Sequence, residues 1–474
     1  MGSSCEDCVE RLDARLPMGA LWRALGTGVC VAPGKPLGST FLMKKVLFWL
    51  GVFVVALAGF RADLAAEQRP NVVLFMADDM GAECVGVYGA GDYKTPRIDA
   101  LAQKGMRFDH AFSTPLCTPS RVQIMTGKYN GRNYREFGYL PPEERTFGHM
   151  MREAGYRTLI AGKWQLNGTY SKEEGWQDLR RPLTMGFDEC SLWQVTREKS
   201  YAERYWDPLI VKNGEERHDE LKGRYGPDVI SDHVVEFIED NAERPFFVYY
   251  PSVLPHDPFV HTPDSANPEA RGKEAFVDMV AYFDKIVGKV VDALSDLGLL
   301  ENTLILVTAD NGTNASIRSR LADGSEIKGA KGAPKFYGTH VPLVAYWKGV
   351  TPSGEVSDAL VDFTDFFPTL ASLGGIDLPE SWGIEGVSFA PTLRGQENPS
   401  ARTWIYTHYD PRWGRWSESR IRFATDRRYK LDSRGRLFDF VDDPLEASPL
   451  AVDAALRPTV TRLRAVLAGN PELP

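Results

Sequence analysis

Two uninterrupted apolar runs, each leading into acidic residues, constrain the fold of this chain most. Residues 71–79 read NVVLFMADD, and residues 304–311 read LILVTADN. A continuous apolar run of this kind is typical of a strand that is buried on both faces of a parallel sheet. Ligands of such sheets bind beyond the carboxyl ends of the strands, so we expect both acidic ends to lie at a binding site.

Amphipathic stretches alternate with short strand candidates between these two runs. Helices are expected over residues 98–104, 147–154 and 276–297, and a strand is expected over residues 246–250. This alternation predicts an α/β fold in which a large mixed, mostly parallel sheet is sandwiched by helices.

The pattern changes near residue 350 to shorter segments with aromatic residues and turns. Residues 429–431 and 437–440 are expected to form antiparallel strands, and residues 451–467 are expected to form a closing helix. About 400 residues exceed what a single core usually organises. We therefore expect a large catalytic α/β domain over residues 67–350 and a smaller C-terminal α+β subdomain over residues 351–474.

The N-terminal region has the pattern of an export signal. Residues 43–45 read MKK, the apolar residues 46–55 follow, and ALA at residues 56–58 offers a small-residue cleavage site. We predict a signal peptide over residues 43–66 and a secreted or periplasmic protein. A membrane span is the competing interpretation, but the apolar stretch is short and ends in charged residues, so no stable membrane insertion of the mature chain is expected. Residues 1–42 fit neither a signal nor this fold, and we interpret them as a spurious upstream extension.

The charge of the chain argues against one class of partner. The 474 residues have a formal net charge of −9 and no basic stripe, which is unlike a protein that binds nucleic acid.

Three cysteines remain once the N-terminal region is removed, namely Cys84, Cys117 and Cys190. Cys84 and Cys190 are available to pair in an oxidising compartment, although the sequence does not give their separation.

A short motif surrounds Cys117. Residues 117–121 read CTPSR, and TG follows at residues 126–127. Thr118 suits a helix N-cap and Pro119 suits the first helical position, so Cys117 is expected just ahead of a helix. The free N–H groups and the positive dipole end of that helix favour an anion. A small buried cysteine beside a turn is the alternative interpretation.

This motif resembles the signature of the type I, formylglycine-dependent sulfatases of the alkaline phosphatase-like superfamily, and further landmarks of that family follow in order from about Asn71 to Leu450. The resemblance implies an exported sulfuric ester hydrolase whose Cys117 is oxidised to formylglycine by a formylglycine-generating enzyme. It implies that one hydroxyl of the hydrated aldehyde attacks sulfur and that the second expels sulfate, which divides one difficult step into two. The expected substrate is a sulfated small molecule or glycan, with a sulfated carbohydrate as the first choice.

The acidic ends of the two apolar runs supply three carboxylates and one amide oxygen. These hard ligands suit calcium or magnesium and suit zinc poorly. Acids that follow a strand can also be turn formers or helix caps. The resemblance implies that one calcium ion is held by Asp78, Asp79, Asp310 and Asn311.

Four cationic side chains are expected around the sulfate ester. The resemblance places the counterparts of Arg121 and Lys128 around the formylglycine. It places those of Lys163 and Lys331 on sulfate oxygens, where they meet the charge that develops on the departing group. Lys328 competes with Lys331, because the usual family continuation after this position is absent.

His256, in the segment LPHDP, matches the Pro-His motif of the family. The resemblance implies that it contacts the substrate and protonates the leaving alcohol. A histidine that is satisfied structurally in a loop is the alternative, and His261 is a nearby, weaker candidate.

One position departs from the family pattern. Residues 162–167 read GKWQLN where the family commonly reads Gly-Lys-Trp-His-Leu-Gly, so Gln165 replaces a histidine that normally hydrogen-bonds the formylglycine hydrate. Gln165 can orient a hydroxyl through its amide, but it cannot take a proton near neutral pH.

An aromatic and basic cluster in the C-terminal part is a candidate for stacking on sugar rings, although aromatic segments are also common in cores. Its members are Trp404, Tyr406, His408, Tyr409, Arg412, Trp413 and Trp416.

Two other functions stay open. A phosphonate or phosphate ester hydrolase of the same superfamily would use nearly the same site. A non-catalytic glycan-binding homologue is suggested by Gln165.

Overall fold

The computed structural model describes residues 69–196, 204–411 and 420–470. The expected upstream extension and signal peptide lie outside these residues, as do three members of the aromatic cluster, Arg412, Trp413 and Trp416. Within the described ranges, no helix combines the length and the apolar character needed to cross a membrane.

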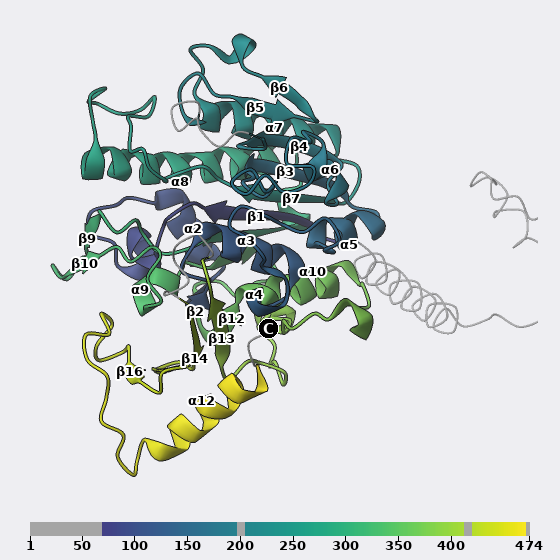
Figure 1. The fold of residues 1–474 in the computed structure, drawn as a ribbon. Helices are drawn as coiled ribbons and strands as arrows, with labels where there is room; N and C mark the ends of the chain where they lie inside the picture. Colours follow the sequence, from purple (N-terminus) through teal and green to yellow (C-terminus); the bar gives the residue numbers. More distant parts are fainter. Residues whose placement is uncertain (1–68, 197–203, 412–419, 471–474) are drawn as a thin grey trace, which may run out of the picture. The chain divides into compact units, whose positions relative to one another are not determined.

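A ten-stranded sheet forms the centre of the molecule (Figure 1). Its strands are β1 (Asn71–Ala77), β2 (Met106–Phe112), β3 (Arg157–Lys163), β4 (Glu189–Trp193), β5 (Ile210–Lys212), β6 (Glu215–Arg217), β7 (Phe246–Pro251), β8 (Thr303–Ala309), β11 (Val344–Trp347) and β12 (Glu355–Asp362). The order is β12-β2-β11-β8-β1-β7-β3-β4-β5-β6. Strands β8, β1, β7, β3 and β4 run parallel, whereas β11 and β5 are antiparallel to their neighbours. The predicted mixed, mostly parallel sheet is therefore confirmed.

Two groups of helices cover the sheet. On one face α2 (Pro96–Lys104) and α7 (Gly226–Asp240) both contact α8 (Gly272–Asp296). On the other face α3 (Cys117–Thr126), α5 (Phe147–Glu153) and α10 (Phe366–Gly374) contact one another (Figure 1). The long helix α8 buries Phe276, Val280, Phe283 and Val287, which recur at helical spacing and form one apolar stripe. The sandwich of helices around a sheet agrees with the prediction.

The register of the central strands determines where the acidic ends lie. Ala77 of β1 stands opposite Ala309 of β8 in a parallel pair. Both strands are buried along their whole length, as their continuous apolar runs predicted. The residues that follow the two strands consequently leave the same edge of the sheet side by side.

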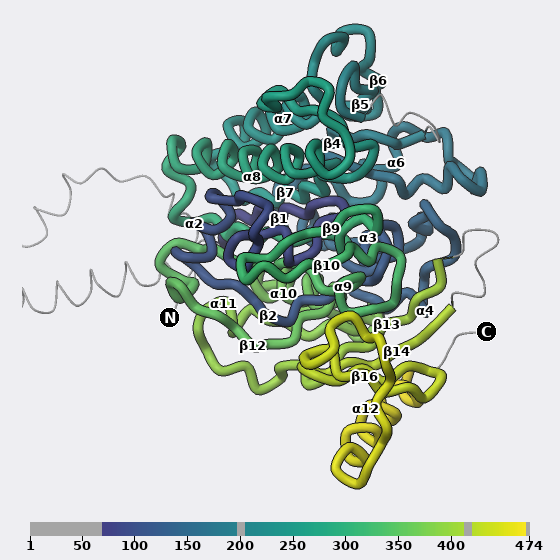
Figure 2. The backbone as a smooth tube through the Cα atoms, turned by 90° about the vertical axis from the view of Figure 1, so that its left-hand side faces the viewer, coloured from purple at the N-terminus to yellow at the C-terminus, as the bar shows by residue number. Residues whose placement is uncertain are grey.

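The C-terminal part adds a second, antiparallel sheet. It contains β13 (Ile405–Tyr409), β14 (Ile421–Thr425), β15 (Tyr429–Asp432) and β16 (Leu437–Asp439). Helix α12 (Arg457–Gly469) packs on it, in yellow in Figure 2. This helix begins later than expected, at a proline-containing first turn, because proline is favoured there. Strand β12 and helix α10 belong to the large sheet and its covering layer, so the expected subdomain start at residue 351 falls inside the α/β layers.

Short elements complete the fold. They are α4 (Asn130–Asn133), α6 (Arg181–Thr184), α9 (Phe336–Thr339), α11 (Ala390–Leu393) and the hairpin of β9 (Arg318–Arg320) and β10 (Glu326–Lys328).

Candidate active site

The carboxyl ends of β1 and β8 bring the four expected metal ligands together. All four are fully buried: Asp78, Asp79, Asp310 and Asn311. The backbone N–H of Asp79 donates to Oδ1 of Asp310 over 3.1 Å, and Nδ2 of Asn311 donates to Oδ1 of Asp79 over 2.9 Å. Asp79 adopts a left-handed φ of 70°, which turns the chain sharply as it leaves the strand.

Two buried cations neutralise part of this cluster. Lys163, the last residue of β3, donates from Nζ to both carboxylate oxygens of Asp78, each over 2.9 Å. Arg121 on α3 donates from Nε and Nη2 to Oδ2 of Asp310, over 3.2 and 2.7 Å. Burial raises the pKa of Asp78, but Lys163 and the other cations outweigh it, so the pKa of Asp78 is lowered overall.

The remaining two carboxyl groups are electrostatically crowded. Burial raises the pKa of Asp310, and the adjacent Asp78 carboxylate adds to this rise. Burial also raises the pKa of Asp79, although Lys331 opposes the shift. Carboxyl groups that are crowded in this way favour an additional positive charge in the site.

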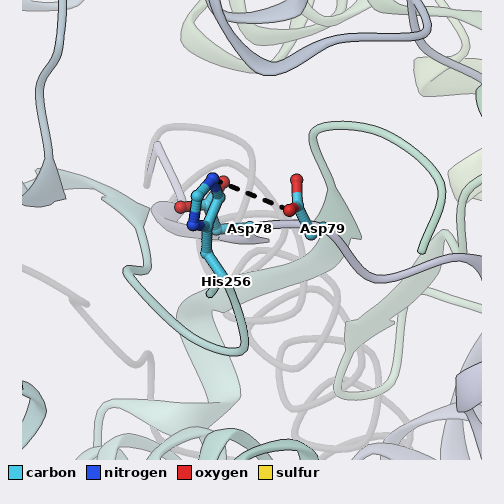
Figure 3. Close-up of side chains that lie close together, drawn as sticks. All are labelled: Asp78, Asp79 and His256. Carbon is cyan, nitrogen blue, oxygen red and sulfur yellow. Dashed lines mark ion pairs between the residues drawn. The ribbon is translucent and has the colours of Figure 1, made fainter. Parts of the chain in front are cut away.

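The donor set fits a hard cation. Oδ1 of Asn311 is buried, and no described group hydrogen-bonds to it. Donor atoms of Asp78, Asp79 and His256 lie within 4.8 Å of one another (Figure 3). Asp310 is not in this group of three; its carboxylate accepts hydrogen bonds from Arg121 and from the Asp79 amide. An oxygen-rich set with an unpartnered amide oxygen is suited to calcium or magnesium.

His256 and Lys331 meet above this cluster. Nζ of Lys331 lies 2.9 Å from Nε2 of His256 and donates to Oδ2 of Asp79 over 2.6 Å. Nδ1 of His256 lies 2.6 Å from the backbone oxygen of Asp257 and donates to it. Burial, and then the charge of Lys331, lower the pKa of His256 well below its ordinary value. His256 is therefore neutral, with its proton on Nδ1 and a hydrogen-bond acceptor at Nε2.

Cys117 is the first residue of α3 and is buried. Its Sγ lies 3.5 Å from Oε1 of Gln165. The prediction that Thr118 caps the helix is wrong: Leu116 is the N-cap residue, and the Thr118 hydroxyl is buried without a partner among the described residues. The helix starts early because Ser120 exchanges hydrogen bonds with Thr114 and so fixes the turn before it.

Two other sequence candidates lie in different surroundings. Nζ of Lys128 donates to Glu144 over 2.9 Å, in a partly exposed ion pair. Lys328 is exposed on the hairpin strand β10, so the structure brings Lys331 and not Lys328 to the acidic cluster.

His261, the alternative acid, stacks on the ring of Trp206 with ring centroids 5.1 Å apart. No described contact joins it to the acidic cluster.

Sequence analysis did not predict three residues of the site region, namely Tyr170, Gln194 and Arg204. Arg204 is buried, donates to the backbone oxygen of Asp257 over 3.0 Å and so lies beside His256. Tyr170 accepts hydrogen bonds from the side chains of Gln165 and Gln194. None of the three stands in a family motif, so the only signal was the nearby Gln165 substitution.

The aromatic cluster divides between the core and the site. Tyr406 packs edge-on against Tyr129 at 5.1 Å in the core of the small sheet. Tyr409 shares a buried cluster with Cys117 and donates from its hydroxyl to the backbone oxygen of Gly332 over 3.0 Å. Tyr409 therefore holds the loop that carries Lys331.

Cys84 and Cys190 are both free and buried. Sγ of Cys84 contacts the Thr313 hydroxyl at 3.3 Å, and Cys190 lies on β4. The pairing considered from the sequence is not formed.

Two family models match the chain. The model described as "Sulfatase" covers residues 70–376, and the model described as "N-sulphoglucosamine sulphohydrolase, C-terminal" covers residues 337–470. Among curated relatives, the N-acetylgalactosamine-6-sulfatase of Canis lupus familiaris is 31% identical over 385 residues, which cover 73% of this chain and 70% of the relative. Human arylsulfatase A is 32% identical over 377 residues, which cover 73% of this chain and 72% of the relative.

Solved structures share the fold. The crystal structure of Ps i-CgsB has a TM-score of 0.70 and 25% identity, covering 85% of this chain and 92% of that chain. The phosphonate monoester hydrolase SpPMH from Silicibacter pomeroyi has a TM-score of 0.63 and 20% identity, covering 85% of this chain and 96% of that chain. These similarities support the large mixed sheet with a small C-terminal sheet.

Proposed function

This chain belongs to the sulfatase family, and we propose that it hydrolyses sulfate esters of carbohydrates with a formylglycine formed from Cys117. The observation that carries the proposal is the position of Cys117 at the buried start of α3, with Gln165 on its sulfur and Lys163, Lys331 and His256 gathered at the acidic strand ends. A sulfated sugar is supported by the name of the canine relative, which is an N-acetylgalactosamine-6-sulfatase.

The nucleophile requires modification of Cys117. Burial raises the pKa of the Cys117 thiol, so the unmodified side chain is a poor thiolate nucleophile at neutral pH. A hydrated aldehyde at this position would supply one hydroxyl to attack sulfur and a second to release sulfate. The intact CTPSR segment is the recognition signal for the modifying enzyme.

Calcium is the metal we assign to Asp78, Asp79, Asp310 and Asn311. Such an ion would act as a Lewis acid on a sulfate oxygen. The carboxylates now accept hydrogen bonds from Lys163 and Lys331, and a cation that took over these oxygens would leave both ammonium groups available to the sulfate. Arg121 orients the Asp310 carboxylate through its two hydrogen bonds and opposes the rise of the Asp310 pKa that burial and Asp78 cause.

The leaving alcohol needs a proton, and we assign its transfer to His256 together with Lys331. The ammonium group of Lys331 donates to Nε2 of His256, so a transferable proton lies between these two side chains. We also propose that Lys128, whose ammonium group pairs with Glu144, contributes positive charge near residue 117.

We further propose that residues 43–66 direct export and that the mature protein is secreted or periplasmic. N-terminal sequencing of protein recovered outside the cytoplasm should begin near Gly59 or Glu67. A mature protein that began near Met1 would contradict this. We keep the proposed catalytic domain at residues 67–350 and the proposed subdomain at residues 351–474, although β12 of the latter pairs with β2 in the large sheet.

Turnover after co-expression with a formylglycine-generating enzyme tests the proposed function. We expect hydrolysis of 4-nitrophenyl sulfate and of members of a sulfated glycan panel, and no hydrolysis by the folded Cys117→Ala variant. Peptide mass spectrometry should find an aldehyde at residue 117. Only free cysteine there, with no turnover of any sulfate, would reject the proposal.

The phosphonate or phosphate ester hydrolase is the second candidate. The similarity to SpPMH concerns the fold alone, so the two candidates are separated by comparing turnover of their substrates. Turnover of 4-nitrophenyl phosphate or a phosphonate monoester well above that of the sulfate would favour it. Glycan affinity with an unmodified Cys117 and no turnover would favour a binding protein.

A further inference from the structure

Two glutamines that follow neighbouring strands share one tyrosine. Nε2 of Gln165, after β3, donates to the Tyr170 hydroxyl oxygen over 3.1 Å, and Nε2 of Gln194, after β4, donates to the same oxygen over 2.8 Å. The backbone also joins them, because the N–H of Gln165 donates to the carbonyl oxygen of Gln194 over 3.1 Å. The two amides and the hydroxyl therefore form one unit, whose other end faces Cys117.

Both glutamines have strained backbones. Gln165 has a φ of 56° and Gln194 has a φ of 58°. Residues other than glycine and asparagine rarely adopt this left-handed region. Such conformations persist where the surrounding structure over-determines them and are concentrated at functional sites. Two such conformations at the ends of adjacent strands fix the directions in which these two side chains leave the backbone.

The tyrosine itself is fixed in place. The Tyr170 ring packs edge-on against Phe137 with ring centroids 5.2 Å apart. A Cβ atom at Gly138 would lie 2.5 Å from Cδ2 of Tyr170, so the ring fills the space that this glycine leaves open. The hydroxyl oxygen is thus held at one point, although 40% of the residue is exposed.

We propose that Tyr170, with Gln194 beside it, is a positioning residue that aims the Gln165 carbonyl oxygen at residue 117. A glutamine amide can present either its oxygen or its nitrogen to a neighbour. Because the Tyr170 oxygen accepts the Gln165 NH₂ group, the Gln165 oxygen must point the other way, and it lies 3.5 Å from Sγ of Cys117. This inference rests on the proposed function, in which the fixed oxygen accepts a hydrogen bond from a hydroxyl at residue 117 and orients it.

The Tyr170→Phe variant tests this proposal, because it keeps the ring against Phe137 and removes only the hydroxyl. With 4-nitrophenyl sulfate we expect kcat to fall about tenfold, as for the loss of one hydrogen bond of about 1.4 kcal/mol, with KM unchanged within about twofold. The fall should be small when Gln165 is already alanine, so the effects of Tyr170→Phe and Gln165→Ala should not multiply. Tyr156→Phe is the matched control, since the Tyr156 hydroxyl is buried without a described partner.

Gln194→Asn provides a second variant that preserves folding, because asparagine tolerates a left-handed φ while its shorter amide falls short of Tyr170. It should lower kcat by about threefold, and melting temperatures of all variants should stay near that of the wild type. Three results would each overturn the positioning role. The losses of Tyr170→Phe and Gln165→Ala could multiply in the double variant, kcat of Tyr170→Phe could equal that of the wild type, or only KM could change. If the wild type does not hydrolyse sulfate at all, the proposed function fails instead, so the two failures are distinguishable.

Discussion

The Nζ atom of Lys331 lies 2.9 Å from Nε2 of His256, at hydrogen-bonding distance between a cation and a neutral imidazole. Asp79 raises the pKa of Lys331 although burial opposes this, so the ammonium group stays charged. The ring nitrogen that faces the site is consequently an acceptor. This pair is the donor we propose for the leaving alcohol, and the first prediction tests it.

The first prediction concerns the leaving group. A sugar alkoxide needs a proton in the transition state, whereas a nitrophenolate leaves readily without one. A positioned acid typically contributes a factor of about 10² to 10⁴. His256→Ala should therefore lose much of that factor on a glycan or alkyl sulfate and far less on 4-nitrophenyl sulfate, as measured by kcat/KM for each substrate.

The two substrates control for folding and for sulfate binding, which both require equally. Equal losses on both would mean that His256 holds sulfate or structure. Lys331→Met should then be compared, because the same leaving-group dependence in that variant alone would identify Lys331 as the acid.

The second prediction concerns the metal. Removal of calcium by a chelator should abolish turnover and lower the melting temperature, since a ligand of the folded state stabilises it by about 2.7 kcal/mol at 100 times its Kd. Asn311→Ala removes the buried, unpartnered Oδ1 and should raise the calcium concentration needed for half-maximal stabilisation. Full activity in protein shown to be metal-free by elemental analysis would reject the assignment.

Much of the fold followed from the sequence because burial on both faces of a strand leaves a strong pattern. The run before Asp78 and the run before Asp310 predicted strands that the structure contains, and the carboxyl-end rule predicted that these acids meet. The predicted ends of the helices and strands were less accurate. The early start of α3 depends on the exchange between Thr114 and Ser120, which involves two hydroxyls that also fit a simple turn.

The parts of the site that escaped prediction depend on contacts between distant loops. Tyr170 contacts Gln194, which is 24 residues later in the chain, and Arg204 contacts the Asp257 oxygen across 53 residues. Neither contact has a periodicity or a spacing that could be read in advance. The strand β12, which pairs with β2 across more than 200 residues, escaped for the same reason.

The third prediction concerns the ion pair that ties the small sheet to the Lys331 loop. Lys430 on β15 pairs with Glu446, and both side chains are buried. Lys430 also donates to the backbone oxygen of Pro334 over 2.7 Å, while Glu446 accepts the N–H of Phe336 over 2.7 Å. Glu446→Ala should destabilise the protein by about 3–5 kcal/mol, because it leaves a buried ammonium group without its counterion.

Urea denaturation measures this change, and kcat should fall in parallel because the Lys331 loop loses an anchor. Asp219→Ala is the control, since its ion pair with Lys222 is highly exposed and should contribute nothing measurable. If Glu446→Ala is as stable as the control, the small sheet does not stabilise the loop.

The fourth prediction concerns the pH dependence of stability. His340 is buried, stacks on Phe336 with ring centroids 4.5 Å apart and donates from Nε2 to the backbone oxygen of Asp109 over 2.9 Å. Burial lowers the pKa of His340 to about 4, and the nearby His110 adds to this. The unfolded chain takes up a proton as pH falls below about 6.5, whereas the folded protein does not until about pH 4. Stability should therefore decline over this window, by up to about 3 kcal/mol from this residue, and stay level above pH 7.

The His340→Gln variant removes this titration and keeps an N–H donor for the Asp109 oxygen. Losing the stacked ring should lower its unfolding free energy by a constant amount at every pH. Urea midpoints of both proteins at pH 8, 6 and 4.5 separate the two effects, because only the titration changes the difference between them. The wild type should have the higher urea midpoint at pH 8, and the difference between the two midpoints should shrink toward pH 4.5. Parallel curves from pH 8 to 4.5 would show that His340 is protonated as readily in the folded protein as in the unfolded chain, which its packing between Phe336 and Phe112 argues against.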